Sequence, residues 1–296
     1  MDNFPVLAFG FAPAPDVDQP ASPGTGCAFP FLADFCTFSA LTIMILLIDI
    51  GNTHTHLGLA SQKRVRKQAN IATALWFGSD AMRRMKRFVG RAAPDGAALC
   101  SVVPRATPRA LGAVKRLWNI SALELTPRTL RGVAIDYPKP GTIGPDRLAN
   151  AVAVKHHYGA PSVAVDFGTA LTFDVVGTRG DYVGGIIAPG LAAMTEYLHE
   201  KTALLPRIEI REVRSSVGKS TEQAMLIGAV HGYRGLVREL IGELKRELKT
   251  RRLPVVATGG YAKLIAAKMP EITVVEPSLT LEGLRLVWTA NSGKAS

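Results

Sequence analysis

The 296-residue sequence has few cysteines, few aromatic residues and no long apolar run. Its three cysteines, Cys27, Cys36 and Cys100, are too few for a disulfide framework and lack the CxxC or CxxH spacing of structural zinc sites. Reduced thiols are typical of a cytoplasmic protein. No stretch of 18 apolar residues occurs, so we expect no membrane-spanning helix and no membrane partner. With 47% hydrophobic and 20% charged residues, the composition is that of a soluble globular protein.

Basic residues are missing from positions 1–43, which hold four acidic residues and no Lys or Arg. The rest of the chain therefore carries 35 basic and 20 acidic residues, a net charge of 35 − 20 = +15. The first segment is rich in Pro, Gly, Ala and Phe, has no helical or strand period and lacks the basic n-region of a signal peptide. We expect residues 1–43 to be a disordered extension, or Met44 to be the true start.

Basic clusters at 63–67, 83–87 and 245–252 raise the question of nucleic-acid binding. No recognition motif accompanies them, and no aromatic residues are interleaved. In the third cluster Glu243 and Glu247 alternate with the basic residues, which is typical of a solvated helix face. A positive field also attracts anionic substrates to an enzyme, which accounts for the charge without nucleic acid. We therefore expect no nucleic-acid partner.

Two segments resemble each other: ILLIDIGNTHTHLGLA at 45–60 and SVAVDFGTALTFDVV at 162–176. Each is an apolar run, then Asp-x-Gly and Thr, then a second apolar run, which predicts a β-hairpin with an acid at its turn. One repetition favours a duplicated α/β architecture, although two ordinary hairpins would give the same pattern. The remaining pattern also alternates strands with helices. We expect strands at 97–103 and 254–258, and helices at 145–158, 221–250, 261–268 and 279–289.

The turn Asp49-Ile50-Gly51-Asn52-Thr53 has the composition of a phosphate loop. Gly51 allows close backbone approach, and the two polar side chains after it can donate to phosphate oxygens. Asp49 is suited to Mg²⁺, which uses one or two carboxylates together with substrate phosphates. Alternatively, Asp49 only caps the turn. The second turn, Asp166 to Thr169, repeats this role or holds a different cation.

Three further motifs are open to two interpretations. Gly259-Gly260 after a strand leaves room for adenine or phosphate, or simply forms a strand-to-helix turn. Asp146-Arg147 at a helix start is a plausible base beside an anion clamp, or a surface ion pair. Gly218-Lys219-Ser220-Thr221 is not a P-loop, because the glycine required upstream is Val213, so a helix cap is the simpler interpretation.

Seven segments together resemble the type III pantothenate kinase family. They are DIGNT (49–53), GPDRLAN (144–150), DFGTALTFD (166–174), GGIIAPG (184–190), KTALLP (201–206), VGKSTEQAM (217–225) and ATGG (257–260). Their order and spacing match from about Met44 to Val287. Pro145 and Leu171 depart from the residues usual in the family. The resemblance implies an α/β fold of duplicated actin-like (ribonuclease H-like) domains with a nucleotide cleft between them. Residues 44–158 would hold the first phosphate loop, and residues 159–296 the second phosphate and adenosine motifs.

The resemblance also implies an activity, which is ATP-dependent phosphorylation of pantothenate to 4'-phosphopantothenate, the first step of coenzyme A biosynthesis. The implied form is a cytoplasmic homodimer that needs Mg²⁺ and a monovalent cation, K⁺ or NH₄⁺. A different class remains open: a non-catalytic, nucleotide-binding regulatory member of the same superfamily. That class would lack the base, whereas Asp146 is present here.

The resemblance assigns roles to individual residues. Asp146 would be the general base. The pantothenate site would comprise Tyr137, Gly144, Pro145, Asp146, Arg147 and Thr221. ATP would be bound by Asp49, Ile50, Gly51, Asn52, Thr53, His54, Thr55, His56, Thr169, Gly259 and Gly260. Asp49 would lie near Mg²⁺, and Asp166 would hold the monovalent cation.

Overall fold

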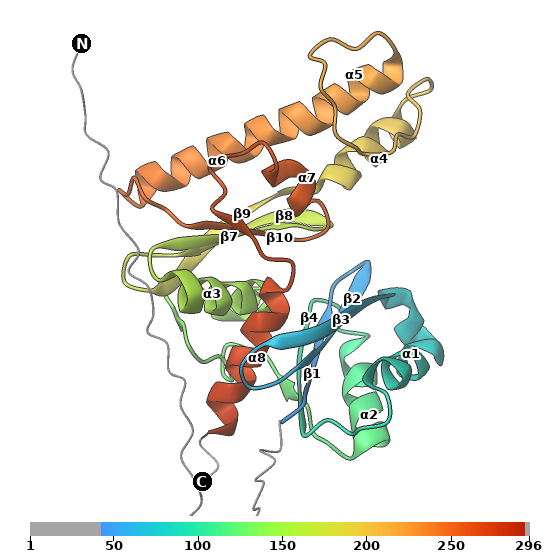
Figure 1. The fold of residues 1–296 in the computed structure, drawn as a ribbon, viewed down its shortest axis with the longest axis vertical. Helices are drawn as coiled ribbons and strands as arrows, with labels where there is room; N and C mark the ends of the chain where they lie inside the picture. Colours follow the sequence, from blue (N-terminus) through green and yellow to red (C-terminus); the bar gives the residue numbers. More distant parts are fainter. Residues whose placement is uncertain (1–42, 294–296) are drawn as a thin grey trace, which may run out of the picture. The chain divides into compact units, whose positions relative to one another are not determined.

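The computed structural model describes residues 43–293, so the prediction for residues 1–43 lies, except for Ile43, outside the described residues. Two sheets form the framework (Figure 1). The first has the order β3-β2-β1-β4-β5. Its strands are β1 (Ile45–Ile50), β2 (His54–Ala60), β3 (Val65–Ala72), β4 (Gly96–Ser101) and β5 (Leu123–Glu124). The second has the order β11-β10-β7-β8-β9-β6. Its strands are β6 (Ala134–Ile135), β7 (Ser162–Phe167), β8 (Ala170–Val176), β9 (Asp181–Pro189), β10 (Val255–Thr258) and β11 (Val274–Val275).

Both predicted hairpins are present, each with the same surroundings. β1 pairs antiparallel with β2 and parallel with β4, while β7 pairs antiparallel with β8 and parallel with β10. The apolar runs before each Asp are buried on both faces, as expected for central strands. Asp49 and Asp166 therefore occupy corresponding places near the ends of two central strands.

The helices lie on both faces of the sheets. They are α1 (Asp80–Val89), α2 (Thr107–Trp118), α3 (Pro145–Tyr158), α4 (Leu191–Lys201), α5 (Thr221–Ile227), α6 (Tyr233–Glu247), α7 (Ala262–Ala266) and α8 (Leu279–Ser292). On β1, Leu46 and Ile48 share a core with α1 and α2, whereas Ile45 and Leu47 share a core with α3 and α8. This alternation follows from the two-residue period of a strand. None of the helices formed by residues 43–293 is long and apolar enough to cross a membrane.

Helices α3 and α8 pack against each other between the two sheets (Figure 1). α3 contacts β7 and β8 of the second sheet, and α8 contacts β1 and β4 of the first. This crossing is close, because a Cβ atom on Gly283 of α8 would lie 1.9 Å from the carbonyl oxygen of Ala149 on α3. The division into domains at residues 158 and 159 stays a prediction.

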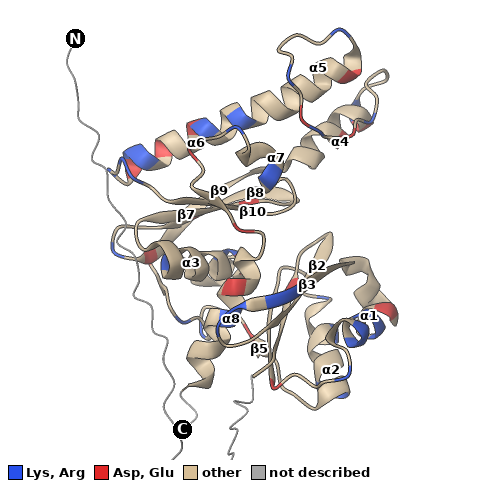
Figure 2. Ribbon diagram, in the orientation of Figure 1, with Lys and Arg blue, Asp and Glu red and all other residues tan. Residues whose placement is uncertain are grey.

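The predicted helix 221–250 is α5 and α6 joined by one π-helical turn, Gly228–Gly232. Its apolar stripe packs on its own sheet, since Val230 is buried and Leu236 lies against the core that contains β7. Basic and acidic positions both occur along α6 (Figure 2). One of the basic residues, Arg246, pairs with Glu239 and Glu243. These exposed ion pairs are those expected of a solvated helix face.

Candidate active site

The turn between β1 and β2 is held by bonds within the first sheet. The Gly51 N–H donates to the carbonyl oxygen of His54 (2.9 Å), which closes the turn. Thr73, just after β3, fixes it from outside: its hydroxyl donates to the Gly51 carbonyl (2.7 Å) and its N–H to the Thr53 carbonyl (3.0 Å). Asn52, Thr53 and His54 are exposed at the tip. Their side chains are therefore free to meet a ligand.

The turn between β7 and β8 meets the first turn. The hydroxyl oxygens of Thr53 and Thr169 lie 3.1 Å apart, although the two residues are 116 positions apart in the chain. Gly190, which ends the GGIIAPG segment, packs directly on this second turn, since a Cβ atom there would lie 2.2 Å from the Thr169 carbonyl oxygen. The structure thus brings the two predicted phosphate turns together.

Asp146 lies in the first turn of α3, with Pro145 at the helix start as predicted. Its carboxylate folds back and accepts from the Arg147 N–H (2.9 Å). Gly144 allows this, because a Cβ atom there would lie 2.4 Å from the carboxylate oxygen. Burial raises the pKa of Asp146. This shift brings the pKa closer to the neutral range in which a general base works best.

Arg147 does not pair with Asp146, so the surface ion pair considered from the sequence is wrong. Its Nε donates to Oδ1 of Asp174 (2.6 Å), and its Nη2 donates to the Phe173 carbonyl (3.2 Å). The guanidinium also lies over the ring of Tyr182, 5.9 Å from its centroid. Its Nη1 makes no hydrogen bond with any residue in the range 43–293. One edge of the guanidinium is therefore fixed, and the remaining nitrogen is available.

Burial raises the pKa of three further aspartates in this region, and neighbouring carboxylates add to each rise. Burial raises the pKa of Asp166 to about 8, and the charges of Asp174, Asp49 and Asp146 add to the rise. Burial raises the pKa of Asp49 to about 6; His56 opposes this shift and Asp146 reinforces it. Burial also raises the pKa of Asp174 to about 6, against the effect of its partner Arg147. Such mutual repulsion is relieved by cations.

No group of three or more His, Cys, Asp or Glu side chains within residues 43–293 is placed to hold a metal by itself. A Mg²⁺ bound through one carboxylate, with substrate oxygens and water as the other ligands, fits this arrangement. Asp49 is a suitable single ligand, since it is only 8% exposed and its Oδ1 accepts from the thiol of Cys100 (3.3 Å). A cation near Asp166 would offset the negative charges of the neighbouring carboxylates.

Several predicted nucleotide contacts are not at the surface of the turn. Thr55 is fully buried, and its hydroxyl bonds to Thr73 (3.0 Å) and accepts from the Trp76 indole (3.0 Å). Ile50 belongs to the core, and His56 faces Asn70 on β3 (2.8 Å). The side chains of Thr55 and Ile50 therefore support the loop rather than contact a ligand.

The two glycines after β10 have different surroundings. A Cβ atom on Gly259 would lie 2.4 Å from a carboxylate oxygen of Asp166, and Gly259 has a φ of +91°. Glycine is therefore required there by the backbone and by the second turn. Gly260 has nothing within 4 Å of the corresponding position. Only Gly260 offers the open surface expected for adenosine.

Two predicted pantothenate residues lie further out. Tyr137 is 39% exposed and packs edge-on against Tyr182, with 6.3 Å between ring centroids. It is thereby linked to Arg147, which lies over the same ring. Thr221 is exposed at the start of α5, where Ser220 rather than Thr221 caps the helix by accepting from the Gln223 N–H (3.2 Å). None of the contacts among residues 43–293 joins Thr221 to Asp146.

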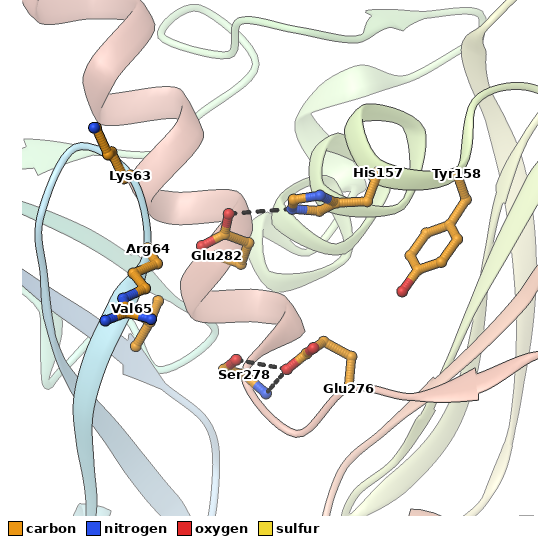
Figure 3. Close-up of a pocket in the computed structure, with 8 residues that line it drawn as sticks. All are labelled: Lys63, Arg64, Val65, His157, Tyr158, Glu276, Ser278 and Glu282. Carbon is orange, nitrogen blue, oxygen red and sulfur yellow. Dashed lines mark hydrogen bonds and ion pairs between the residues drawn. The ribbon is translucent and has the colours of Figure 1, made fainter. Parts of the chain in front are cut away.

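Sequence reasoning assigned no role to four residues that shape the site: Thr73, Cys100, Asn150 and Asp174. Asn150 lies three positions after Arg147 on the same face of α3, and it also donates to Asp174 (3.1 Å). That spacing was a usable signal, whereas nothing in the sequence marks Thr73 or Cys100. A separate cavity between the β2–β3 turn, the end of α3 and the start of α8 contains none of the predicted residues (Figure 3).

Duplicated hairpins whose acidic turns meet define an α/β fold of duplicated actin-like domains, as the motifs in the sequence imply. Two solved structures share the fold. One is described as a Baf family transcriptional activator from Campylobacter jejuni, with a TM-score of 0.56 and 17% identity over 84% of this chain and 99% of that one. The other is described as a 2-dehydro-3-deoxygalactonokinase from Sinorhizobium meliloti, with a TM-score of 0.54 and 14% identity over 85% and 97%. At these identities the likeness shows the fold alone.

The sequence comparisons identify the family. The type III pantothenate kinase family model matches residues 45–243. A type III pantothenate kinase from Methylacidiphilum infernorum is 44% identical over 248 residues, which cover 82% of this chain and 87% of that protein. One from Akkermansia muciniphila is 44% identical over 242 residues, which cover 81% and 96%. The chain belongs to the type III pantothenate kinase family, as the sequence motifs predict.

Proposed function

We propose that the chain transfers the γ-phosphoryl group of ATP to the primary hydroxyl of pantothenate, the first step of coenzyme A biosynthesis. The observation that carries this proposal is the 44% identity over 82% of the chain to a protein named type III pantothenate kinase. The placement of Asp146 among the residues around the joined turns supports it. A non-catalytic nucleotide-binding protein would have no need of a carboxylate there.

Asp146 is the proposed general base. An alcohol is a poor nucleophile, and a carboxylate within hydrogen-bond reach accepts its proton as the phosphoryl group is transferred. Phosphoryl transfer otherwise depends on positioning and on charge stabilisation. The helix start fixes the Asp146 carboxylate, since it accepts from the backbone N–H of Arg147.

Arg147 is the proposed partner of the pantothenate carboxylate. Its Nη1 has no hydrogen-bond partner among residues 43–293, and its position next to Asp146 sets the distance between the carboxylate and hydroxyl ends of the substrate. Tyr137 and Gly144 complete this pocket. Thr221 contributes from α5.

The triphosphate of ATP would lie on the joined turns. Asn52, Thr53 and Thr169 offer side-chain donors there, and Gly260 offers an open surface for adenosine. Asp49 would hold Mg²⁺ and Asp166 would hold K⁺ or NH₄⁺. These cations, when bound, neutralise the charge that builds up on the phosphates. The nucleotide cleft would then separate an N-terminal domain of residues 44–158 from a C-terminal domain of residues 159–296.

We also propose that the protein works as a homodimer. α4 and α5 line an apolar groove of about 880 Å³, and the α4 side chains beside it are exposed, Tyr197 by 61% and Leu198 by 41%. Apolar side chains exposed next to one another favour association, and a two-fold arrangement covers such a patch on both copies. Thr221 starts α5, so an interface here would lie beside a proposed substrate contact.

The proposed function is tested by ADP release coupled to NADH oxidation, measured with and without pantothenate and K⁺. We expect ADP release only when pantothenate is present, with stimulation by K⁺ over Na⁺. Binding of ATP without pantothenate-dependent ADP release would instead favour the non-catalytic regulatory protein. Sedimentation of the unaltered chain and of Leu198→Asp tests the dimer, since a dimer that survives this change would exclude the α4 surface.

A further inference from the structure

A chain of three hydrogen bonds, buried at its centre, runs from α8 to Arg147. The Thr280 hydroxyl on α8 donates to Oδ1 of Asn150 on α3 (2.8 Å). The Asn150 amide then donates to Oδ2 of Asp174 on β8 (3.1 Å), and Oδ1 of Asp174 accepts from Nε of Arg147 (2.6 Å). The chain thus connects α8, α3 and β8, and its last hydrogen bond is to the guanidinium of Arg147.

Asp174 is the centre of this chain. It is fully buried, and both of its oxygens are occupied by a specific donor. A buried carboxylate is costly unless it is paired and hydrogen-bonded. Replacing such a pair by apolar residues is often neutral or stabilising, so stability alone is a weak reason for it. Its geometric effect is specific, because a guanidinium held at Nε and Nη2 cannot rotate about its own axis.

We infer that Asp174 is a positioning residue that aims the free Nη1 of Arg147 at the carboxylate of the substrate, with Asn150 and Thr280 fixing the direction of Asp174. This inference rests on the proposed phosphorylation of pantothenate. The Phe173 carbonyl and the ring of Tyr182 constrain the same guanidinium from two further sides. Asp174 on β8 and Thr280 on α8 therefore contribute to the specificity for an acidic substrate, because they orient Arg147.

The close fit around the guanidinium supports this assignment. A Cβ atom on Gly185 of β9 would lie 2.4 Å from Nη2 of Arg147 and 1.7 Å from the Phe173 carbonyl oxygen. Only glycine leaves space for the guanidinium to reach the carbonyl. Gly185 also lies in the GGIIAPG segment, which otherwise has no polar group to contribute.

The test compares two substrates, pantothenate and pantothenol, in which an alcohol replaces the carboxylate. The variant is Asp174→Asn, which keeps the shape but removes the charge that holds Arg147. We expect the KM for pantothenate to rise about tenfold or more, the size of one lost charge-assisted interaction, with little change in kcat or in the KM for ATP. We expect the preference for pantothenate over pantothenol, as a ratio of kcat/KM, to fall by a similar factor.

Glu271→Gln is the matched control. Glu271 also pairs with an arginine, Arg238 on α6 (2.7 Å), and neither residue belongs to the site. We expect the control to keep the preference. A general loss of structure in Asp174→Asn would affect both substrates equally, and an unchanged preference would overturn the inference. Asn150→Ala, a milder change of the same chain, should reduce the preference in the same direction, and its failure to do so would exclude the contribution of Asn150.

The outcomes separate this inference from the proposed function. If the unaltered chain releases no pantothenate-dependent ADP, the proposed function fails before any variant is compared. Suppose instead that the unaltered chain phosphorylates pantothenate and that Asp174→Asn prefers pantothenate over pantothenol as strongly as the unaltered chain. Only the positioning role of Asp174 then fails.

Discussion

Gly283→Ala tests the packing of α3 against α8, on which the placement of Asp146 depends. A Cβ atom at this position would lie 1.9 Å from the carbonyl oxygen of Ala149 and 2.5 Å from its carbon. Ordinary contact begins near 3.4 Å, so the helices must separate by about 1.5 Å. Overpacking of this kind costs about 1–3 kcal/mol, and the better helix propensity of alanine offsets only about 1 kcal/mol. We expect the free energy of unfolding to fall by up to about 2 kcal/mol.

Gly242→Ala provides the control, because it makes the same change inside another helix. Near Gly242 only the end of the Arg246 side chain comes close, at 3.6 Å, which is an ordinary contact. Helix propensity then acts alone, and we expect the free energy of unfolding to rise by about 1 kcal/mol. Urea unfolding followed by tryptophan fluorescence measures both, since Trp288 of α8 packs against Gly96 of β4. An increase in stability for Gly283→Ala, similar to that of Gly242→Ala, would refute the close crossing.

Three further predictions concern the site and the start of the chain. Asp146→Asn should lower kcat by about 10²–10⁴, with an unchanged melting temperature, in the ADP-release assay; turnover within a few-fold of the unaltered chain would contradict its role as base. The pKa of Asp166 is raised from 3.8 to about 8. Between about pH 4 and pH 8, Asp166 is therefore protonated in the folded protein and ionised in the unfolded chain. Stability without added cations should therefore decline as pH rises from 4 to 8, by at most about 1.4 kcal/mol per pH unit from this group, and Asp166→Asn should remove that part. Melting curves in K⁺-free buffer measure it, and identical pH profiles would disprove it. A chain that begins at Met44 should keep its melting temperature and activity, because the family match starts at residue 45 and a terminal amine can still donate to Asp95 as the Met44 N–H does (2.7 Å); a drop of several degrees would contradict this.

Much of the fold was predictable because its signals are local. An apolar run that ends in Asp-x-Gly predicts a buried strand and a turn, and both hairpins follow from that pattern alone. Pro145 and Asp146 marked the start of α3 in the same way. The two-residue strands β5, β6 and β11 were missed, since two residues carry no period and these strands exist only through pairing with distant partners.

The contacts of the site were less predictable, because they join residues that are far apart in the chain. The sequence indicated that Asp146 and Arg147 belong together, but the partner of the guanidinium is Asp174, 27 positions away. Likewise, Thr73 holds the first turn from the end of the next strand, 22 positions from Gly51. Such pairs depend on register and on the packing of α3 against β8, which no local pattern specifies.

The accumulation of like charge favours the proposal that the duplicated hairpin is a ligand site and not only a structural repeat. The fold places an aspartate near the end of each of two central strands and adds Asp146 and Asp174 from the segments packed beside them. Burial raises the pKa values of Asp49 and Asp166, and the charges of neighbouring carboxylates raise them further. Only Asp174 has a fixed basic partner of its own, Arg147. If cations accompany a bound triphosphate as proposed, they would offset the charge of the other three carboxylates. It follows that nucleotide and cations should each bind more tightly in the presence of the other, by the same factor.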